Sequence, residues 1–170
     1  QHKPNISQLT YVAYKRMVDN RIAPYFKRLN IKLKEVTGDE VNDFYTQIRS
    51  DGLKGTSAQR YHSLLHLAFK HAVKRRIIPS NPCDQADRPK SVPYISEYLN
   101  ADEIITLVSS LEGDPIRMVV ILAAYYGLRR SEIIGLKWSA IDFRNKTITI
   151  RHKVVELDKG RRELLALDVM

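Results

Sequence analysis

A short segment in the second half of the chain brings an arginine, a serine and a glutamate together just after a glycine: Gly127, Arg129, Ser131 and Glu132. An arginine keeps its charge at physiological pH, and its planar guanidinium donates paired hydrogen bonds to oxyanions. Arg129 lies at the expected start of a helix, where the helix dipole disfavours a cation, so its placement suits a residue that meets an anion. Glu132 either orients Arg129 or caps its own helix.

The elements around Arg129 must hold it in place. Asn100, with Glu103 three residues later, is a capping pattern that starts a helix. A strongly apolar helix begins with Pro115 at its first position, and we expect it to be buried as far as Tyr126. The expected order is helices 101–111, 115–126 and 131–139, a strand at 147–150, and strands 153–157 and 162–167 paired across residues 158–160.

The stretch 124–142 carries several fixed positions at a defined spacing. These are Gly127-Leu128-Arg129, Ser131-Glu132, Leu136, Trp138 and Asp142. This pattern resembles the first signature box of the tyrosine recombinases, the phage-integrase family; Tyr126 and Ala140 depart from it without removing chemistry. The resemblance extends over nearly the whole chain. It implies a mainly α fold, with a small helical core-binding (SAM-like) bundle followed by the α-helical start of a catalytic domain and a short antiparallel β-ribbon. Within that fold we expect Trp138 in the core.

The resemblance also implies a chemistry, which is DNA strand exchange without a metal or nucleotide cofactor. In this family a tyrosine near the C-terminus attacks a backbone phosphate and forms a covalent 3′-phosphotyrosine, while two arginines hold the non-bridging oxygens. Such catalysis combines a nucleophile with stabilisation of the charge that builds on phosphorus. By position, Arg129 matches the first of the two arginines, and Glu132 is expected to support it.

Other parts of such an active site have no counterpart in the sequence. None of the five histidines is followed by an arginine three residues later, so the His-x-x-Arg box with the second arginine is absent. No tyrosine follows Tyr126, and both Tyr125 and Tyr126 belong to the expected buried helix rather than to a nucleophile site. The family also uses a lysine on the β-ribbon, which protonates the leaving 5′-oxygen. Lys153 and Lys159 lie near the expected ribbon, but that lysine usually follows the ribbon turn, so its identity stays open. We therefore expect this segment alone to be unable to cleave DNA.

The first half of the chain carries the whole excess of positive charge. Residues 1–83 hold 15 Lys and Arg against 6 Asp and Glu, whereas residues 97–170 hold 11 of each. Such asymmetry suggests a polyanionic partner for the first half, although a basic surface can also serve solubility. The candidate DNA-binding residues are Lys54, Thr56, Ser57, Arg60, Lys70, Lys74, Arg75 and Arg76, with Lys15 and Arg16 in second place.

Apolar periodicity predicts that the first half is helical. A helix should run from Gln8 toward Leu29, with a kink or break at Pro24. A second helix opens at residue 37 or 39 and buries positions 41, 44, 45 and 48. A third begins with Thr56 or Ser57 as its cap, extends to about residue 76, and buries Ala58, Tyr61, Leu65, Ala68 and Ala72.

Four prolines between residues 79 and 93 make a continuous helix implausible there. We therefore expect a core-binding domain at 1–83, a linker at 84–96, and the start of a catalytic domain at 97–170. Cys83, the single cysteine, rules out an internal disulfide and is expected to be an ordinary small residue beside the linker. His62 and His66 lie four residues apart on one helix face, but no third metal ligand is apparent, so a basic helix surface is expected.

The resemblance implies that the partner is double-stranded DNA with a core-type recombination site. It also implies that the full-length protein forms a homotetramer on DNA. An excision or directionality factor and a host DNA-bending protein are further partners that it implies. It implies a cytoplasmic, nucleoid-associated protein of bacterial or phage origin. The longest apolar run is nine residues, which is too short to span a membrane. Two alternatives stay open: a non-catalytic DNA-binding regulator with the same two-domain clamp, and a helical bundle whose basic half binds an acidic protein.

Overall fold

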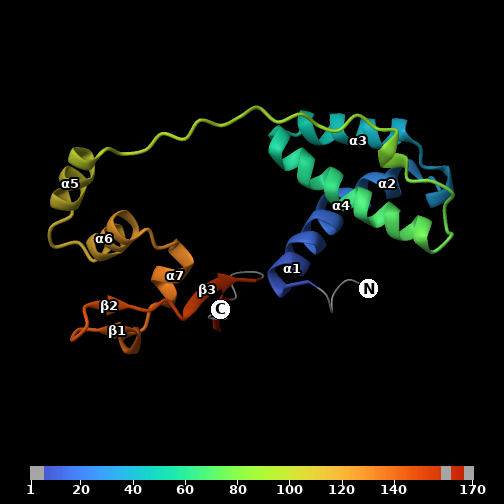
Figure 1. Ribbon diagram of the computed structural model, residues 1–170. Helices are drawn as coiled ribbons and strands as arrows, with labels where there is room; N and C mark the ends of the chain where they lie inside the picture. Colours follow the sequence, from blue (N-terminus) through green and yellow to red (C-terminus); the bar gives the residue numbers. More distant parts are fainter. Residues whose placement is uncertain (1–5, 158–161, 167–170) are drawn as a thin grey trace. The chain divides into compact units, whose positions relative to one another are not determined.

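The computed structural model describes residues 6–157 and 162–166 (Figure 1). These residues divide into two compact units, and the boundary falls between Ile95 and Ser96. The first unit is a helical bundle, and the second combines three short helices with two pairs of antiparallel strands. The mainly α fold with a short β-ribbon, predicted from the sequence, is confirmed.

The first helical stretch does not break at Pro24. Helix α1 (Gln8–Met17) continues through a π-helical turn, η2 (Val18–Ile22), into α2 (Ala23–Leu29). Proline lacks an amide hydrogen, and Pro24 lies in the first turn of α2, where the wider turn before it absorbs the missing hydrogen bond. The helix ends at Asn30, which takes a left-handed conformation with φ of 51°.

Helix α3 (Gly38–Ser50) follows a short 3-10 turn, η3 (Leu33–Glu35), and its start is set by a reciprocal cap. The Thr37 hydroxyl accepts from the Asp39 amide at 3.2 Å, and the Glu40 carboxylate accepts from the Thr37 amide at 2.7 Å. The predicted buried face is confirmed, because the side chains at positions 41, 44, 45 and 48 are all buried.

Helix α4 (Gly55–Lys74) begins earlier than the sequence suggested. Its N-cap is Lys54, so Thr56 and Ser57 lie in the first turn and the predicted hydroxyl cap is wrong. Its buried residues are Ala58, Leu64, Leu65, Phe69 and Ala72. Ala68 is exposed, because it lines surface hollows between α4 and the first helical stretch, and Tyr61 is only half-buried at the edge of the core.

Aromatic rings fill the space between α2, α3 and α4. Phe44 is 1% exposed, and its ring centroid lies 5.1 Å from that of Tyr25 and 6.0 Å from that of Tyr61. Both pairs meet edge to face, the arrangement that aromatic quadrupoles favour. This core fixes α4 against the bundle and thereby determines which face of α4 is left for a partner.

Residues 84–90, predicted to be linker, pack against the first unit; we call them the docked segment. They follow a 3-10 turn, η4 (Pro82–Asp84). The Asp87 amide donates to the Asn42 side-chain oxygen at 2.8 Å, and the Gln59 side chain donates to the Pro89 carbonyl at 2.9 Å. Residues 92–100 are exposed and lack regular structure, so only this later part of the expected linker is extended.

The second unit contains helices α5 (Ala101–Ser110), α6 (Ile116–Tyr126) and α7 (Arg130–Gly135), followed by a 3-10 turn, η5 (Trp138–Ala140). Strand β1 (Ile141–Asp142) pairs with β2 (Thr147–Ile148), and β3 (His152–Glu156) pairs with β4 (Arg162–Ala166). The second pairing confirms the predicted ribbon. Strand β2 is shorter than expected, and α7 ends four residues before the predicted residue 139. Lys159 lies outside the described residues.

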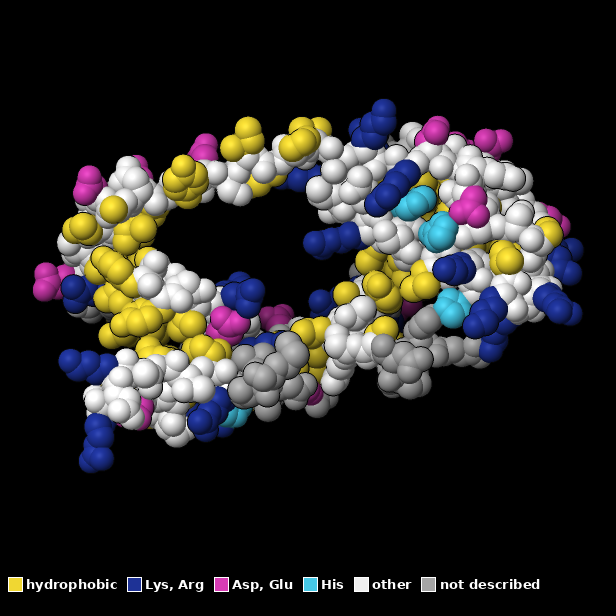
Figure 2. All heavy atoms as spheres, in the orientation of Figure 1, with side chains coloured by type: hydrophobic (Ala, Val, Ile, Leu, Met, Phe, Trp, Pro, Cys, Tyr) yellow, Lys and Arg dark blue, Asp and Glu magenta, His cyan; other side chains and the backbone are white. Residues whose placement is uncertain are grey.

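Two predictions about burial in the second unit are wrong. Helix α6 has no buried residue, and Met118, Tyr125 and Tyr126 are each more than half exposed. Trp138 is 81% exposed instead of lying in a core. The described elements of this unit are short helices and two-stranded ribbons, and they are too few to cover both faces of an apolar helix. Apolar side chains accordingly gather on the surface of this unit (Figure 2).

No helix among the described residues is long and apolar enough to cross a membrane.

Candidate functional site

A left-handed turn after α6 sets the position of Arg129. Gly127 caps α6 with φ of +66°, and its amide donates to the Ala123 carbonyl at 3.1 Å. The next amide, of Leu128, donates to the Leu122 carbonyl at 3.3 Å. A residue with a β-carbon is disfavoured in this conformation, so glycine is what allows the chain to reverse here.

Arg129 is the N-cap of α7 and is tied to Glu132 at two points. The Arg129 amide donates to Glu132 Oε2 at 2.8 Å, and its guanidinium Nη1 donates to Oε1 at 3.1 Å. The sequence left open whether Glu132 caps its helix or orients Arg129, and in the structure it does both. The Arg129 side chain is 83% exposed whereas that of Glu132 is 14% exposed, so the glutamate lies beneath the arginine and leaves its remaining N–H groups free for an anion.

The charge of Glu132 is stabilised by its surroundings. Hydrogen bonds from the Arg129 backbone and side chain lower the pKa of the Glu132 carboxyl, and the positive charge of Lys153 lowers it further. An ionised Glu132 at neutral pH holds Arg129 by charge-assisted bonds.

Strand β3 packs directly against α7 at Gly135. A β-carbon at Gly135 would lie 2.8 Å from the Lys153 Cα and 2.9 Å from the His152 carbonyl oxygen, so only glycine permits this approach. The close packing brings the charge of Lys153 within reach of Glu132. Of the two lysines considered for the ribbon, Lys153 lies near Glu132 and Arg129, whereas Lys159 lies outside the described residues.

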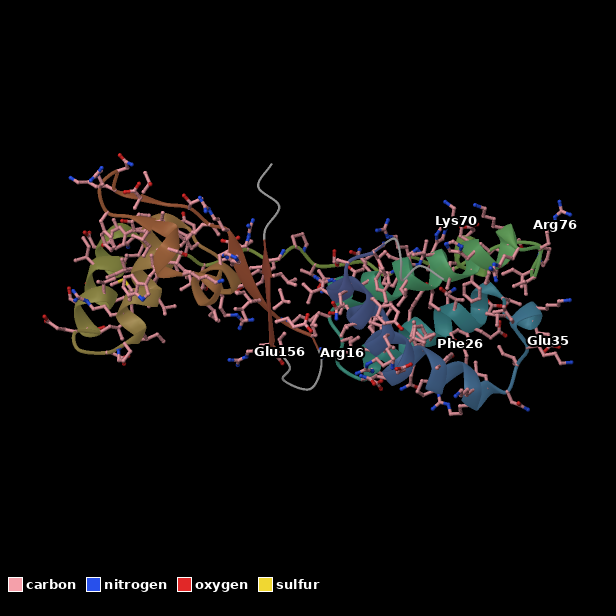
Figure 3. All side chains as sticks on the ribbon, turned by 90° about the horizontal axis from the view of Figure 1, so that it is seen from below. Arg16, Phe26, Glu35, Lys70, Arg76 and Glu156 are labelled. Atoms are coloured by element: carbon pink, nitrogen blue, oxygen red, sulfur yellow. The ribbon has the colours of Figure 1, made fainter. Side chains whose placement is uncertain are left out.

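The candidate DNA-binding residues of the first unit fall at the two ends of α4. Lys54, Thr56, Ser57 and Arg60 lie at its start, and Lys70, Lys74, Arg75 and Arg76 lie at its end. A helix of 20 residues is about 30 Å long, so no single phosphate meets both groups. Figure 3 shows the Lys70 and Arg76 side chains pointing outward on one side of the unit, with Glu35 on the opposite side.

Arg76 ends α4 in an unusual conformation. Its φ is +57°, its amide donates to the Val73 carbonyl at 2.8 Å, and the Ile77 amide donates to the Ala72 carbonyl at 2.9 Å. A left-handed residue commonly ends a helix in this way, although glycine is usual there. The buried side chain of Ile78 holds the reversal in place. The predicted helix end near residue 76 is confirmed to within two residues.

His62 and His66 of α4 do not form a simple basic surface. His62 Nδ1 lies 2.8 Å from the Tyr45 hydroxyl, and His66 Nε2 lies 2.9 Å from the Asp84 carboxylate. No group of three or more metal-ligating side chains occurs among the residues that the structure describes. Cys83 is buried in the core, and burial raises the pKa of its thiol to about 11.

One residue of this region was missed by sequence reasoning. Arg88 belongs to the docked segment and lines the same hollow as His62, His66 and Lys70. The helical spacing of the three α4 residues was visible in the sequence. The position of Arg88 beside α4 depends on hydrogen bonds between residues more than 20 positions apart in the sequence, and no local sequence pattern predicts these.

Comparisons with known proteins agree with this architecture in both units. Residues 97–166 match the model of the phage integrase family, and residues 1–48 match the model of the phage integrase N-terminal SAM-like domain. The chain is 22% identical over 148 residues to a tyrosine recombinase XerC-like protein of Caldanaerobacter subterraneus subsp. tengcongensis, covering 81% of this chain and 38% of that protein. It is 27% identical over 142 residues to the ICEBs1 integrase of Bacillus subtilis, covering 82% of this chain and 37% of that protein.

A solved structure of the Tn1549 transposon integrase, in complex with a circular intermediate DNA, superposes with a TM-score of 0.69 at 17% identity. The match covers 92% of this chain and 56% of that one, so it establishes a shared fold. The chain spans well under two thirds of the length of these relatives.

Proposed function

This chain belongs to the phage integrase family of tyrosine recombinases, and on that premise we propose its function. It is the DNA-binding part of a site-specific recombinase that integrates or excises a mobile element or prophage. The first unit binds double-stranded DNA through α4, and the second unit supplies the first catalytic arginine, Arg129, with Glu132 as its support. The parent protein cleaves and rejoins DNA through a phosphotyrosine intermediate and acts as a tetramer on its core-type site.

The observation that carries this proposal is the exposed Arg129 guanidinium held from below by a nearly buried glutamate. The Glu132 carboxylate accepts from the Arg129 amide and from one guanidinium nitrogen, so it favours rotamers that keep the arginine over Glu132. Pre-positioned donors stabilise charge as it develops on phosphorus, because little reorganisation is needed during the reaction.

The 170 residues by themselves are expected to bind DNA without cutting it. The sequence has no His-x-x-Arg box and no tyrosine beyond Tyr126, so the second arginine and the nucleophile are missing. Incubation with duplex DNA followed by denaturing electrophoresis should reveal no covalent adduct. A phosphotyrosine-linked adduct formed by this chain would contradict the assignment of the nucleophile to another part of the parent protein.

DNA binding is tested by fluorescence anisotropy of a labelled 30-base-pair duplex over a range of NaCl concentrations. Each phosphate contact contributes about 0.9 to the slope of log K against log salt, so a protein that makes several contacts should show a steep slope. Arg129→Ala should lower the slope by about 0.9. Arg130→Ala is the matched control, because this neighbouring arginine is also exposed and its side chain forms no hydrogen bond or ion pair with a residue that the structure describes.

A salt-independent affinity, or equal affinity for the duplex and for heparin at every salt concentration, would overturn DNA as the partner. Equal slopes for Arg129→Ala and the wild type would leave DNA binding intact and remove Arg129 from the phosphate contacts.

A further inference from the structure

A hollow of about 460 Å³ lies on the first unit between α4 and the docked segment. In Figure 2 two histidine side chains lie next to each other on the surface of this unit, with Lys or Arg side chains and one acidic side chain around them. The residues that line the hollow are His62, Ser63, His66, Leu67, Lys70 and Arg88.

Three of these side chains come from one face of α4. His62, His66 and Lys70 follow each other at intervals of four residues, so each lies about one turn above the previous one. The centroids of the two imidazole rings are 6.0 Å apart. The hollow thus extends from the middle of α4 to Lys70, the first of the candidate DNA-binding residues at the C-terminal end of the helix.

The fourth nitrogen-bearing side chain, Arg88, comes from the docked segment and is fixed by its neighbours in sequence. The amide of Asp87 is bonded to Asn42 of α3, and the carbonyl of Pro89 is bonded to Gln59 of α4. Pro89 is buried, so the backbone on both sides of Arg88 is anchored while its side chain remains exposed.

The hollow has more positive charge than its acidic neighbours neutralise. Neither Lys70 nor Arg88 forms an ion pair with any residue that the structure describes. The acidic side chain beside the hollow is that of Asp84, and its carboxylate is hydrogen-bonded to His66 Nε2. Asp87 lines a neighbouring hollow together with Asn42, and Arg88 borders both hollows. Lys70 and Arg88 are therefore available to an anion.

His62 is held so that one nitrogen is left for a ligand. Its Nδ1 is bonded to the hydroxyl of Tyr45, which also lies 3.9 Å from the Cys83 sulfur. Burial, followed by the charges of Arg88 and His66, lowers the pKa of His62, while Asp84 acts in the opposite direction. His62 is therefore mainly neutral at pH 7 and gains a proton when an anion offsets the nearby cations.

Resting on the proposed function, we propose that this hollow is a phosphate site for the backbone of double-stranded DNA, built by His62, His66 and Lys70 of α4 and completed by Arg88 of the docked segment. The docked segment then has a role in DNA binding, because the site exists only while residues 84–90 are packed on the bundle. A duplex phosphate placed here would lie along α4, beside the candidate DNA-binding residues at its C-terminal end.

Two measurements on the 170-residue chain test this site. In the first, anisotropy of the 30-base-pair duplex is measured against NaCl for Arg88→Ala, Lys70→Ala and Lys34→Ala. The first two variants should each lower the salt slope by about 0.9, the value of one lost phosphate contact. Lys34, beside Glu35 in η3, is an exposed lysine outside the hollow, and its variant should match the wild type.

In the second measurement, inorganic phosphate is titrated while the imidazole NMR signals are followed. Phosphate should shift the His62 and His66 signals in the wild type and should shift them less in Arg88→Ala. Binding of an anion favours protonated His62, so duplex affinity should rise as the pH falls from 8 to 6. His62→Gln retains an acceptor for Tyr45 and should flatten this pH dependence.

The outcomes separate the two proposals. If the wild type binds the duplex steeply with salt but Arg88→Ala behaves like Lys34→Ala, the phosphate site is wrong and the proposed function stands. Phosphate-induced imidazole shifts without any change in the salt slope of Arg88→Ala would overturn duplex DNA as the ligand. Failure of the wild type to bind the duplex would overturn the proposed function, and the phosphate titration would then decide whether the hollow binds anions.

Discussion

Replacing Asn81 with alanine should destabilise the first unit strongly, although the residue lies in a proline-rich stretch that resembles a linker. Asn81 is 7% exposed. Its side-chain oxygen accepts from the Cys83 amide at 3.1 Å, and its side-chain nitrogen donates to the His66 carbonyl at 3.2 Å. These two bonds cap η4 and tie it to α4.

The magnitude follows from the two bonds that are lost. Removing a side-chain cap costs about 1 kcal/mol, and a second hydrogen bond contributes about 1 kcal/mol more. The Cys83 amide is left buried without this partner, which raises the total to about 2–3 kcal/mol. For a unit of fewer than 100 residues, 1 kcal/mol shifts the melting temperature by about 4–8 °C, so a decrease of about 10 °C or more is expected.

Circular dichroism at 222 nm is the suitable assay, because most helical residues belong to the first unit. Asn20→Ala is the control: Asn20 is exposed on the π-helical turn, and its side chain has no hydrogen bond to a residue that the structure describes. A melting temperature for Asn81→Ala within about 2 °C of the control would refute the reasoning, since it would make Asn81 an ordinary linker residue.

Four further predictions follow from single residues. Gly55→Ala should loosen the docked segment, because a methyl group there overlaps the Lys90 carbonyl oxygen; hydrogen exchange at the Asp87 amide should accelerate, and unchanged exchange would show that the segment is not held at this contact. Glu132→Gln should lower the melting temperature of the second unit near pH 7, because the lowered pKa of the Glu132 carboxyl gives stability that is present above its ordinary value near 4.5 and is lost as the pH falls; the melting temperatures of variant and wild type should converge by about pH 3, and an equal difference at both pH values would contradict this role of the Glu132 charge. Cys83 should resist a thiol reagent at pH 8 until the chain unfolds, because its pKa is raised to about 11, and rapid labelling of the folded chain would contradict its burial. Trp138 should be quenched by acrylamide nearly as well as free tryptophan, whereas strong protection would restore the core position that the sequence suggested.

The sequence predicted most of the helices because their limits depend on neighbouring residues. The cap at Thr37 needs only Glu40 three residues later, and the cap at Asn100 needs only Glu103. The end of α6 depends on the φ of Gly127, which glycine adopts without steric cost. The buried face of α3 follows from helical periodicity, which fixes which side chains share a face.

Predictions of burial were less successful, because burial depends on what covers a helix rather than on the helix itself. The apolar sequence of α6 predicted a core, yet none of its residues is buried, because the other described elements of its unit leave them partly or fully uncovered. Ala68 and Phe69 are adjacent in sequence, and only the packing of α4 on α3 decides that Phe69 is buried while Ala68 is not.

By itself, the sequence determined the family pattern around Arg129, the positive charge of residues 1–83 and the helical nature of the first unit. Only the tertiary structure decided that Lys153 of β3 approaches Glu132, and that Arg88 joins His62, His66 and Lys70 in one hollow. The reason is physical: spacing along one helix is set by local geometry, whereas the approach of separate segments depends on the packing and hydrogen bonds of the whole unit.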